Sequence, residues 1–149
     1  SNQINKEFPL PNRNSMTLKK MRQLQEVHIK SNKILVKMNE PLCIRKHNEL
    51  TNKDWYYSTK QADEFEQQCD LVIKNQLLTA GFSEEVSSVK MIPIDSKTVC
   101  VKHYGINIEC SLGTFMLEGN TEILDYLLKS GVGSRRSSGF GVMSLLAEE

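Results

Sequence analysis

The order of hydrophobic patterns along the chain restricts its fold more than any other sequence feature. Residues 61–80 place apolar side chains mainly three and four positions apart, which predicts an amphipathic helix, and Gly81 follows where that helix would stop. A second helix is predicted after Asn120, a residue type that caps helix starts, and Gly131 stops it. Apolar segments without this helical spacing precede, separate and follow the two predicted helices.

Four of those segments show the alternation that is typical of β-strands: 27–38, 97–104, 106–110 and 142–146. Gly105 joins the middle two, so we expect a hairpin there, and a change of alternation at Gly113 predicts a bulge. Residues 39–60 are expected to form an irregular loop or a hairpin. The order predicts an α+β, ferredoxin-like (RRM-like) βαββαβ fold, with two helices on one face of a four-stranded antiparallel sheet.

The length of 149 residues suits one domain and a short extra segment. Because Pro9, Pro11 and a polar stretch interrupt the first part, we expect residues 1–26 to be a linker or the end of a preceding domain, and 27–149 to be the domain itself. The chain starts with Ser1 and Asn2 and has no initiator methionine, so we expect a tag-cleavage scar on a piece of a longer protein.

The sequence gives no support for a membrane protein and little for a zinc-binding one. No run approaches the roughly 18 apolar residues that cross a bilayer, and no hydrophobic leader is present, so we expect a cytoplasmic protein without a membrane partner. The cysteines show no Cys-x-x-Cys spacing, and the pairs Cys43 with His47 and Cys100 with His103 are weak zinc signals. We therefore expect reduced, mostly buried thiols, with no metal and no cofactor.

Charge is distributed unevenly along the chain. Residues 12–60 hold 11 Lys and Arg against 4 Asp and Glu, whereas residues 61–149 hold 7 against 13, and the net charge is only +1. This asymmetry allows a positive face that binds phosphate, but it also allows the two parts to neutralise each other across the fold. Both interpretations stay open from charge alone.

The segment 131–141 (GVGSRRSSGFG) holds four of the eight glycines in the chain. Glycines allow a backbone to approach a ligand closely and to turn its N–H groups outward, while Arg135, Arg136 and the serines supply donors that suit phosphate. Because it follows a helix and precedes a strand, the segment is not a dinucleotide fingerprint, and it lacks the Gly-Lys-Ser/Thr of a P-loop. A phosphate-binding loop and a plain flexible connector remain the two alternatives.

Residues 112–120 (LGTFMLEGN), the helix after them and residues 131–142 together resemble the C-terminal signature of the CRISPR-associated endoribonuclease that processes precursor CRISPR RNA, a member of the RAMP superfamily. Residues 29–36 (IKSNKILV) are also similar to a strand of that family, with Asn32 and Lys33 in place of a single proline. The resemblance covers roughly residues 27–146.

This resemblance implies metal-independent cleavage of repeat RNA by attack of a 2′-hydroxyl, leaving a 2′,3′-cyclic phosphate. The family has two ferredoxin-like domains, and its catalytic histidine usually lies in the first. The resemblance therefore implies that this chain is the C-terminal domain, which would bind RNA without cutting it. Two alternatives remain: a non-catalytic RAMP subunit that binds guide RNA among the proteins of an effector complex, and a protein-interaction module.

The expected RNA-binding residues lie in the glycine-rich segment and in the first strand: Gly131, Gly133, Ser134, Arg135, Arg136, Ser137, Ser138, Gly139, Gly141, Lys30 and Lys33. The catalytic residue is not identified, and His47 is the best candidate because it lies in a basic loop. His28 and His103 lie in predicted strands, where a structural role is favoured. Packing is likewise the favoured role for Trp55, Tyr56 and Tyr57, although each could stack on bases.

Overall fold

The computed structural model describes residues 29–149. The predicted linker 1–26 therefore lies outside the described residues, as do His28 and the start of the predicted first strand.

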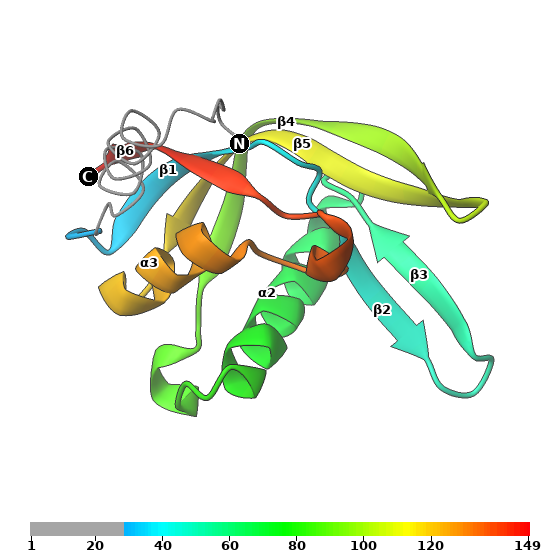
Figure 1. Cartoon of the computed structure of the whole chain (residues 1–149), viewed down its shortest axis with the longest axis horizontal. Coiled ribbons are helices and arrows are strands. Elements are labelled where there is room, and N and C mark those ends of the chain that lie inside the picture. Colours follow the sequence, from blue (N-terminus) through cyan, green and yellow to red (C-terminus); the bar gives the residue numbers. More distant parts are fainter. Residues whose placement is uncertain (1–28) are drawn as a thin grey trace, which may run out of the picture.

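A four-stranded antiparallel sheet organises the molecule, with the strand order β4-β5-β1-β6 (Figure 1). The strands are β1 (Lys33–Met38), β4 (Lys90–His103), β5 (Ile106–Glu118) and β6 (Met143–Glu148). The chain enters the sheet at a central strand and ends at an edge, as it does in a ferredoxin-like fold. The predicted fold class is confirmed.

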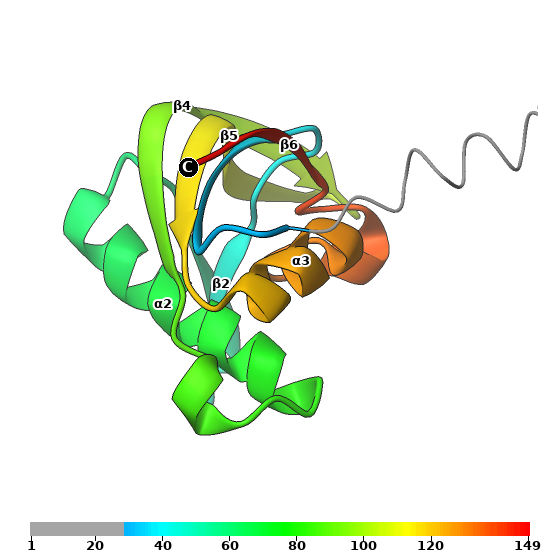
Figure 2. The same ribbon diagram turned by 90° about the vertical axis from the view of Figure 1, so that its left-hand side faces the viewer.

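Helices α2 (Ala62–Thr79) and α3 (Thr121–Ser130) lie on the same side of the sheet (Figures 1 and 2). Phe65, Cys69 and Ile73 recur every four residues along α2, and all three are buried in the main core with Val36 of β1. The side chain of Asn120 accepts hydrogen bonds from two N–H groups in the first turn of α3. Asn120 is therefore the N-cap that the sequence predicts.

A second, two-stranded sheet is inserted between β1 and α2. It consists of β2 (Ile44–Asn48) and β3 (Lys53–Tyr57), which pair as a hairpin. Of the two structures predicted for residues 39–60, an irregular loop or a hairpin, the hairpin is therefore the one observed. The Asn48 side chain accepts hydrogen bonds from two N–H groups within the turn. Two short 3-10 helices, η1 (Glu84–Val86) and η2 (Arg136–Ser138), complete the secondary structure of the described part.

Several predicted strand ends need correction, and two strands extend past their predicted ends: β5 to Glu118 and β6 to Glu148. Strand β1 begins at Lys33, because the N–H groups of Lys30 and Ser31 donate to the side-chain carboxylate of Glu148 and not to backbone carbonyls. Strand β4 begins before the predicted position and contains Pro93 and Ile94.

The bulge expected at Gly113 is found on the partner strand, where the register shifts between Pro93 and Asp95. The alternation of β5 changes because its two ends pack into different clusters. Phe115 lies in the main core, whereas Ile108 packs with Phe140 in a smaller cluster.

Other sequence expectations concern the thiols and the membrane. All four cysteines are free, and three of them are buried: Cys43, Cys69 and Cys110. None of the helices in residues 29–149 is long and apolar enough to span a bilayer. The same residues contain no group of three or more His, Cys, Asp or Glu side chains placed to hold a metal ion.

Candidate nucleic-acid interface

The glycine-rich segment 131–141 connects α3 to β6 and is held by hydrogen bonds to distant parts of the chain. Its ends join where the Val132 N–H donates to the Gly141 carbonyl, at 3.0 Å. The Ser134 N–H donates to the carbonyl of Cys43 at 2.8 Å, next to the start of β2. Gln76 of α2 accepts from the Gly133 N–H and donates to the Gly131 carbonyl, each at 3.0 Å. The segment is thus a fixed part of the fold and not a free connector.

Gly133 and Gly141 make this packing possible. Both have positive φ angles, of 95° and 87°. A Cβ atom at Gly133 would lie 2.8 Å from the Cys43 carbonyl oxygen, and one at Gly141 would lie 2.0 Å from the Val132 carbonyl oxygen. Only glycine combines that backbone conformation with so close an approach.

These hydrogen bonds limit which groups of the segment are free to bind phosphate. The N–H groups of residues 131–134, 138, 139 and 141 all donate within the protein, so they are not turned outward as the glycine pattern suggests. The exposed groups of the segment are the side chains of Arg136, Ser137 and Ser138. Any phosphate contact therefore depends on side chains more than on the backbone.

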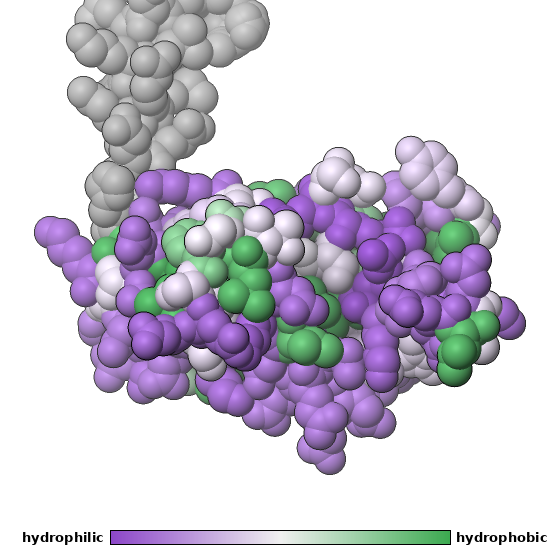
Figure 3. Space-filling model, turned by 90° about the horizontal axis from the view of Figure 1, so that it is seen from below, coloured by the Kyte–Doolittle hydropathy of each residue, from purple (hydrophilic) through white to green (hydrophobic). Residues whose placement is uncertain are grey.

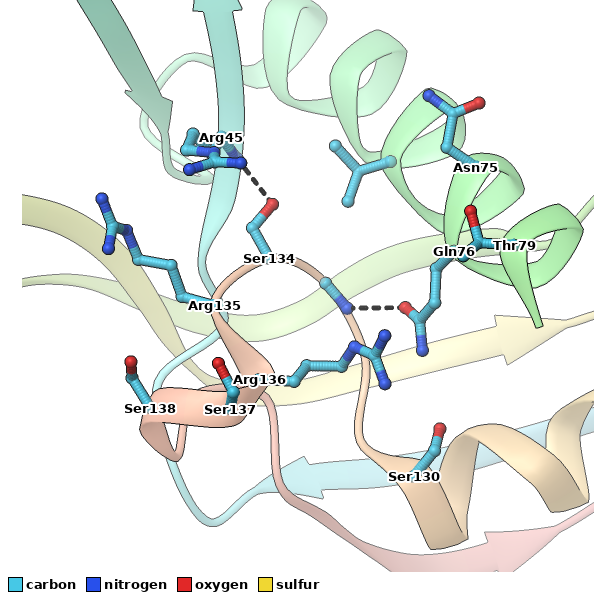
Figure 4. Close-up of a pocket in the computed structure, with 12 residues that line it drawn as sticks. Arg45, Asn75, Gln76, Thr79, Ser130, Ser134, Arg135, Arg136, Ser137 and Ser138 are labelled. Carbon is cyan, nitrogen blue, oxygen red and sulfur yellow. Dashed lines mark hydrogen bonds between the residues drawn. The ribbon is translucent and has the colours of Figure 1, made fainter.

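An open groove of about 820 Å³ lies between α2 and this segment (Figure 4). Three arginines line it, Arg45, Arg135 and Arg136, and no aspartate or glutamate of the described residues does. The remaining lining side chains are neutral, including Asn75, Gln76 and Thr79 of α2. We call this cavity the arginine groove. Its lining favours an anionic ligand.

The two arginines of the segment differ in their surroundings, and they extend in opposite directions in Figure 4. Arg135 donates from Nε and Nη2 to the Tyr56 hydroxyl, at 3.1 and 2.6 Å, and this hydrogen bonding raises its pKa. Its Nη2 also lies 3.7 Å from Asp54 Oδ2. Arg136 has no hydrogen-bond or ion-pair partner for its side chain among residues 29–149. Arg136 is therefore the guanidinium that is free to bind an anion.

Asp54 connects the β2–β3 hairpin to the segment. Its Oδ1 lies 2.7 Å from Nδ1 of His47, and its Oδ2 lies 3.7 Å from Nη1 of Arg45. The hydrogen bond with His47 lowers the pKa of Asp54, and the positive charges of Arg45 and Arg135 add to this effect. Asp54 thus links Arg45 and His47 of β2 to Arg135 of the segment.

The structure brings together only part of the predicted site. Ser134, Arg135, Arg136, Ser137, Ser138 and Gly133 all line the arginine groove. Lys30 and Lys33 do not: Lys30 precedes β1, and Lys33 is its first residue, 3.4 Å from Glu149. His47 is outside the lining as well, although its partner Asp54 contacts two of the arginines.

The predicted set lacks six residues of the groove: Arg45, Val72, Asn75, Gln76, Thr79 and Ser130. Arg45 belongs to the basic stretch 12–60, and the structure shows that its N–H donates to the Ser134 hydroxyl at 3.1 Å. Gln76 is a polar side chain on the buried stripe of α2, with 8% of its surface exposed. A polar residue on an apolar stripe signals a buried hydrogen bond, and this signal could have identified Gln76.

This fold and this groove define a class of protein. The chain is an α+β domain with a ferredoxin-like fold, in which a glycine-rich segment before the last strand forms one wall of a cationic groove. It belongs to the family described as CRISPR associated protein Cas6, C-terminal, whose model matches residues 22–145.

Solved structures of low sequence identity share the fold. A Cas6-related protein from Pyrococcus furiosus superimposes with a TM-score of 0.63 at 21% identity, over 83% of this chain and 51% of that one. A structure described as "An RAMP protein binding different RNA substrates" has a TM-score of 0.67 at 18% identity, over 81% and 52% of the two chains.

Cse3 of Thermus thermophilus, bound to an RNA that represents a pre-cleavage complex, has a TM-score of 0.52 at 12% identity, over 82% and 57% of the two chains. The chain thus spans little more than half the length of each of these structures. No curated protein matches the sequence.

Proposed function

We propose that this chain is the RNA-binding C-terminal domain of an endoribonuclease that processes precursor CRISPR RNA, and that the RNA backbone lies in the arginine groove. The observation that carries the proposal is the lining of the groove, which has three guanidinium groups and no carboxylate from the described residues. Arginine offers donors in a planar fork that matches two phosphate oxygens at once. Membership of the Cas6 family makes repeat RNA the phosphate-bearing ligand to test first.

The cleavage itself belongs to the longer enzyme. Attack of a ribose 2′-hydroxyl on the adjacent phosphate would release a 5′-hydroxyl and leave a 2′,3′-cyclic phosphate, without a metal. Among solved relatives, Cse3 of Thermus thermophilus is bound to an RNA that represents the complex before cleavage. The function would place the protein in the cytoplasm, where it could pass its product to the proteins of an effector complex.

Two alternatives make different demands on the surface. A non-catalytic RAMP subunit would also bind RNA, so it would use the same groove. It would differ from the endoribonuclease only outside this domain. A protein-interaction module needs a continuous apolar surface or a complementary charged one. Figure 3 shows hydrophobic residues as separate patches on the face seen from below, so that face offers no continuous apolar surface to a partner protein.

RNA affinity of arginine variants tests the proposal. We expect Arg136→Ala to weaken binding of repeat RNA roughly tenfold at low salt, because the variant cannot form one charge-assisted hydrogen bond to phosphate. For single-stranded RNA, removing one cation that neutralises a phosphate should make the slope of log affinity against log salt shallower by about 0.7. Fluorescence anisotropy over a salt series measures both quantities.

Lys97→Ala is the control, because Lys97 is an exposed cation on β4 that does not line the groove. Its affinity and salt slope should equal those of the unchanged chain. Absence of RNA binding by the unchanged chain at low salt would refute the proposal and favour the protein-interaction module.

A further inference from the structure

The two walls of the arginine groove differ in chemistry. The wall formed by segment 131–141 and β2 carries the cations, whereas the wall formed by α2 carries Asn75, Thr79 and the apolar side chain of Val72. Asn75 and Thr79 are four residues apart, so they project from the same face of the helix. The groove therefore offers charge on one side and neutral hydrogen-bonding groups on the other (Figure 4).

Asn75 has no function within the protein that its position explains. It is exposed in the C-terminal half of α2, and its side chain has no hydrogen-bond partner among residues 29–149; the same is true of Thr79. Asparagine is a weak helix former and contributes little at such a position. The neighbouring Gln76, in contrast, uses its amide to hold segment 131–141. The unused amide of Asn75 is thus available to the groove and does not support the fold.

An unpaired carboxamide in such a place can distinguish nucleobases. Its carbonyl accepts a hydrogen bond and its amino group donates one, which matches the N6 amino group and the adjacent ring nitrogen of adenine. Proteins that recognise single-stranded RNA bind the exposed base edges in this way while cations hold the backbone. A groove of about 820 Å³ has room for a base beside its phosphate.

We propose that the α2 wall of the groove is a nucleobase subsite, and that Asn75 gives it a preference for adenine, with Thr79 as a second hydrogen-bonding group. This inference rests on the proposed function, because it assumes that RNA phosphate occupies the arginine wall. It assigns different effects to the two walls: the arginines determine affinity for any RNA, and Asn75 determines the preference for one base.

Selection from an RNA library of random sequence tests the subsite. For the unchanged chain we expect one position at which adenine is preferred about tenfold over the other bases, within the range of one bidentate contact. Asn75→Ala should abolish this preference by lowering affinity for the selected RNA about tenfold, to that of RNAs without the adenine. Its salt slope should equal that of the unchanged chain, since no phosphate-binding cation is removed. Alanine favours helix, so this variant is expected to fold.

Two further variants make the test specific. Asn75→Asp keeps the shape but only accepts hydrogen bonds, so it should lose the adenine preference as well. Gln67→Ala is the matched control, because Gln67 is another exposed amide on α2 that lines a different pocket, and its variant should keep the preference.

The possible outcomes separate the two proposals. RNA binding without any base preference, or a preference that persists in Asn75→Ala, overturns the subsite and leaves the proposed function standing. Absence of RNA binding overturns both. An adenine preference that Arg136→Ala removes, and that Asn75→Ala leaves intact, would assign recognition to the opposite wall and so overturn the subsite.

Discussion

At the scale of single residues, Gly133 and Gly139 show how the same backbone angle can serve different purposes. Both glycines have a φ of 95°, in the left-handed region that disfavours other residues. Gly133 is buried against the Cys43 carbonyl, whereas a Cβ atom at Gly139 would meet nothing within 4 Å. The sequence marks both as glycines in a loop, and only their surroundings distinguish a packing requirement from a turn requirement.

This pair yields a stability prediction. We expect Gly139→Ala to lower the free energy of unfolding by about 1 kcal/mol, the cost of the backbone angle alone. Gly133→Ala should lower it by about 3 kcal/mol, because the added methyl group also collides with backbone. Urea denaturation measures both variants. Equal losses would contradict the close packing of the segment against residues 42–44.

At the scale of elements, the β2–β3 hairpin and the segment 131–141 are coupled through Asp54. This carboxylate, with 25% of its side chain exposed, lies between His47 of β2 and two of the groove arginines, Arg45 and Arg135. The hairpin therefore positions Arg45 in the groove and at the same time orients Arg135 through Tyr56.

The lowered pKa of Asp54 predicts a pH dependence of stability. Its folded pKa is below the unfolded value, so its contribution is complete above the unfolded pKa and is lost as pH falls through the folded pKa. Between about pH 6 and about pH 3, the unchanged chain should lose up to about 1 kcal/mol more than Asp54→Asn does.

Urea denaturation at both pH values measures this difference. Asp95→Asn serves as a control, because Asp95 is exposed and has no ion-pair partner among residues 29–149. That variant should show the same pH dependence as the unchanged chain. If Asp54→Asn does so too, the carboxylate does not link the hairpin to the groove.

At the scale of the whole molecule, the chain contains a cationic groove but spans little more than half of each solved relative described above. His47 is the candidate base within the described residues, and Asp54 holds its Nδ1. It does not line the arginine groove, so a phosphate bound by the groove arginines would not itself contact the His47 imidazole.

We therefore predict that the chain alone binds repeat RNA in the presence of EDTA without cutting it. Gel electrophoresis of end-labelled RNA detects any product, and chemical analysis of its ends detects a 2′,3′-cyclic phosphate. Specific cutting that disappears in His47→Gln but persists in His103→Gln would assign the catalytic role to His47, contrary to this prediction.

Local patterns were sufficient for most of the fold. Residues close in sequence determine the apolar stripe of α2, the cap at Asn120 and the alternation of the strands. Such features can therefore be predicted from short stretches of sequence. The predicted position of the bulge was wrong because the inserted residue, Ile94, lies on β4. The change of alternation that suggested a bulge is visible in the sequence of the partner strand, β5. The predicted start of β1 was wrong because Glu148, distant in sequence, competes for the N–H groups that precede it.

The order of the elements, the ferredoxin-like fold and the place of the glycine-rich segment between the last helix and the last strand all follow from the amino-acid sequence alone. Which groups of that segment face a ligand depends instead on contacts between distant parts of the chain. The N–H groups of Gly133 and Ser134 donate to Gln76 and Cys43, so they are not free for a ligand. The β2–β3 hairpin places Arg45 in the groove beside the exposed guanidinium of Arg136. Periodicity is a property of adjacent residues, whereas a groove depends on which distant residues satisfy each other's polar groups.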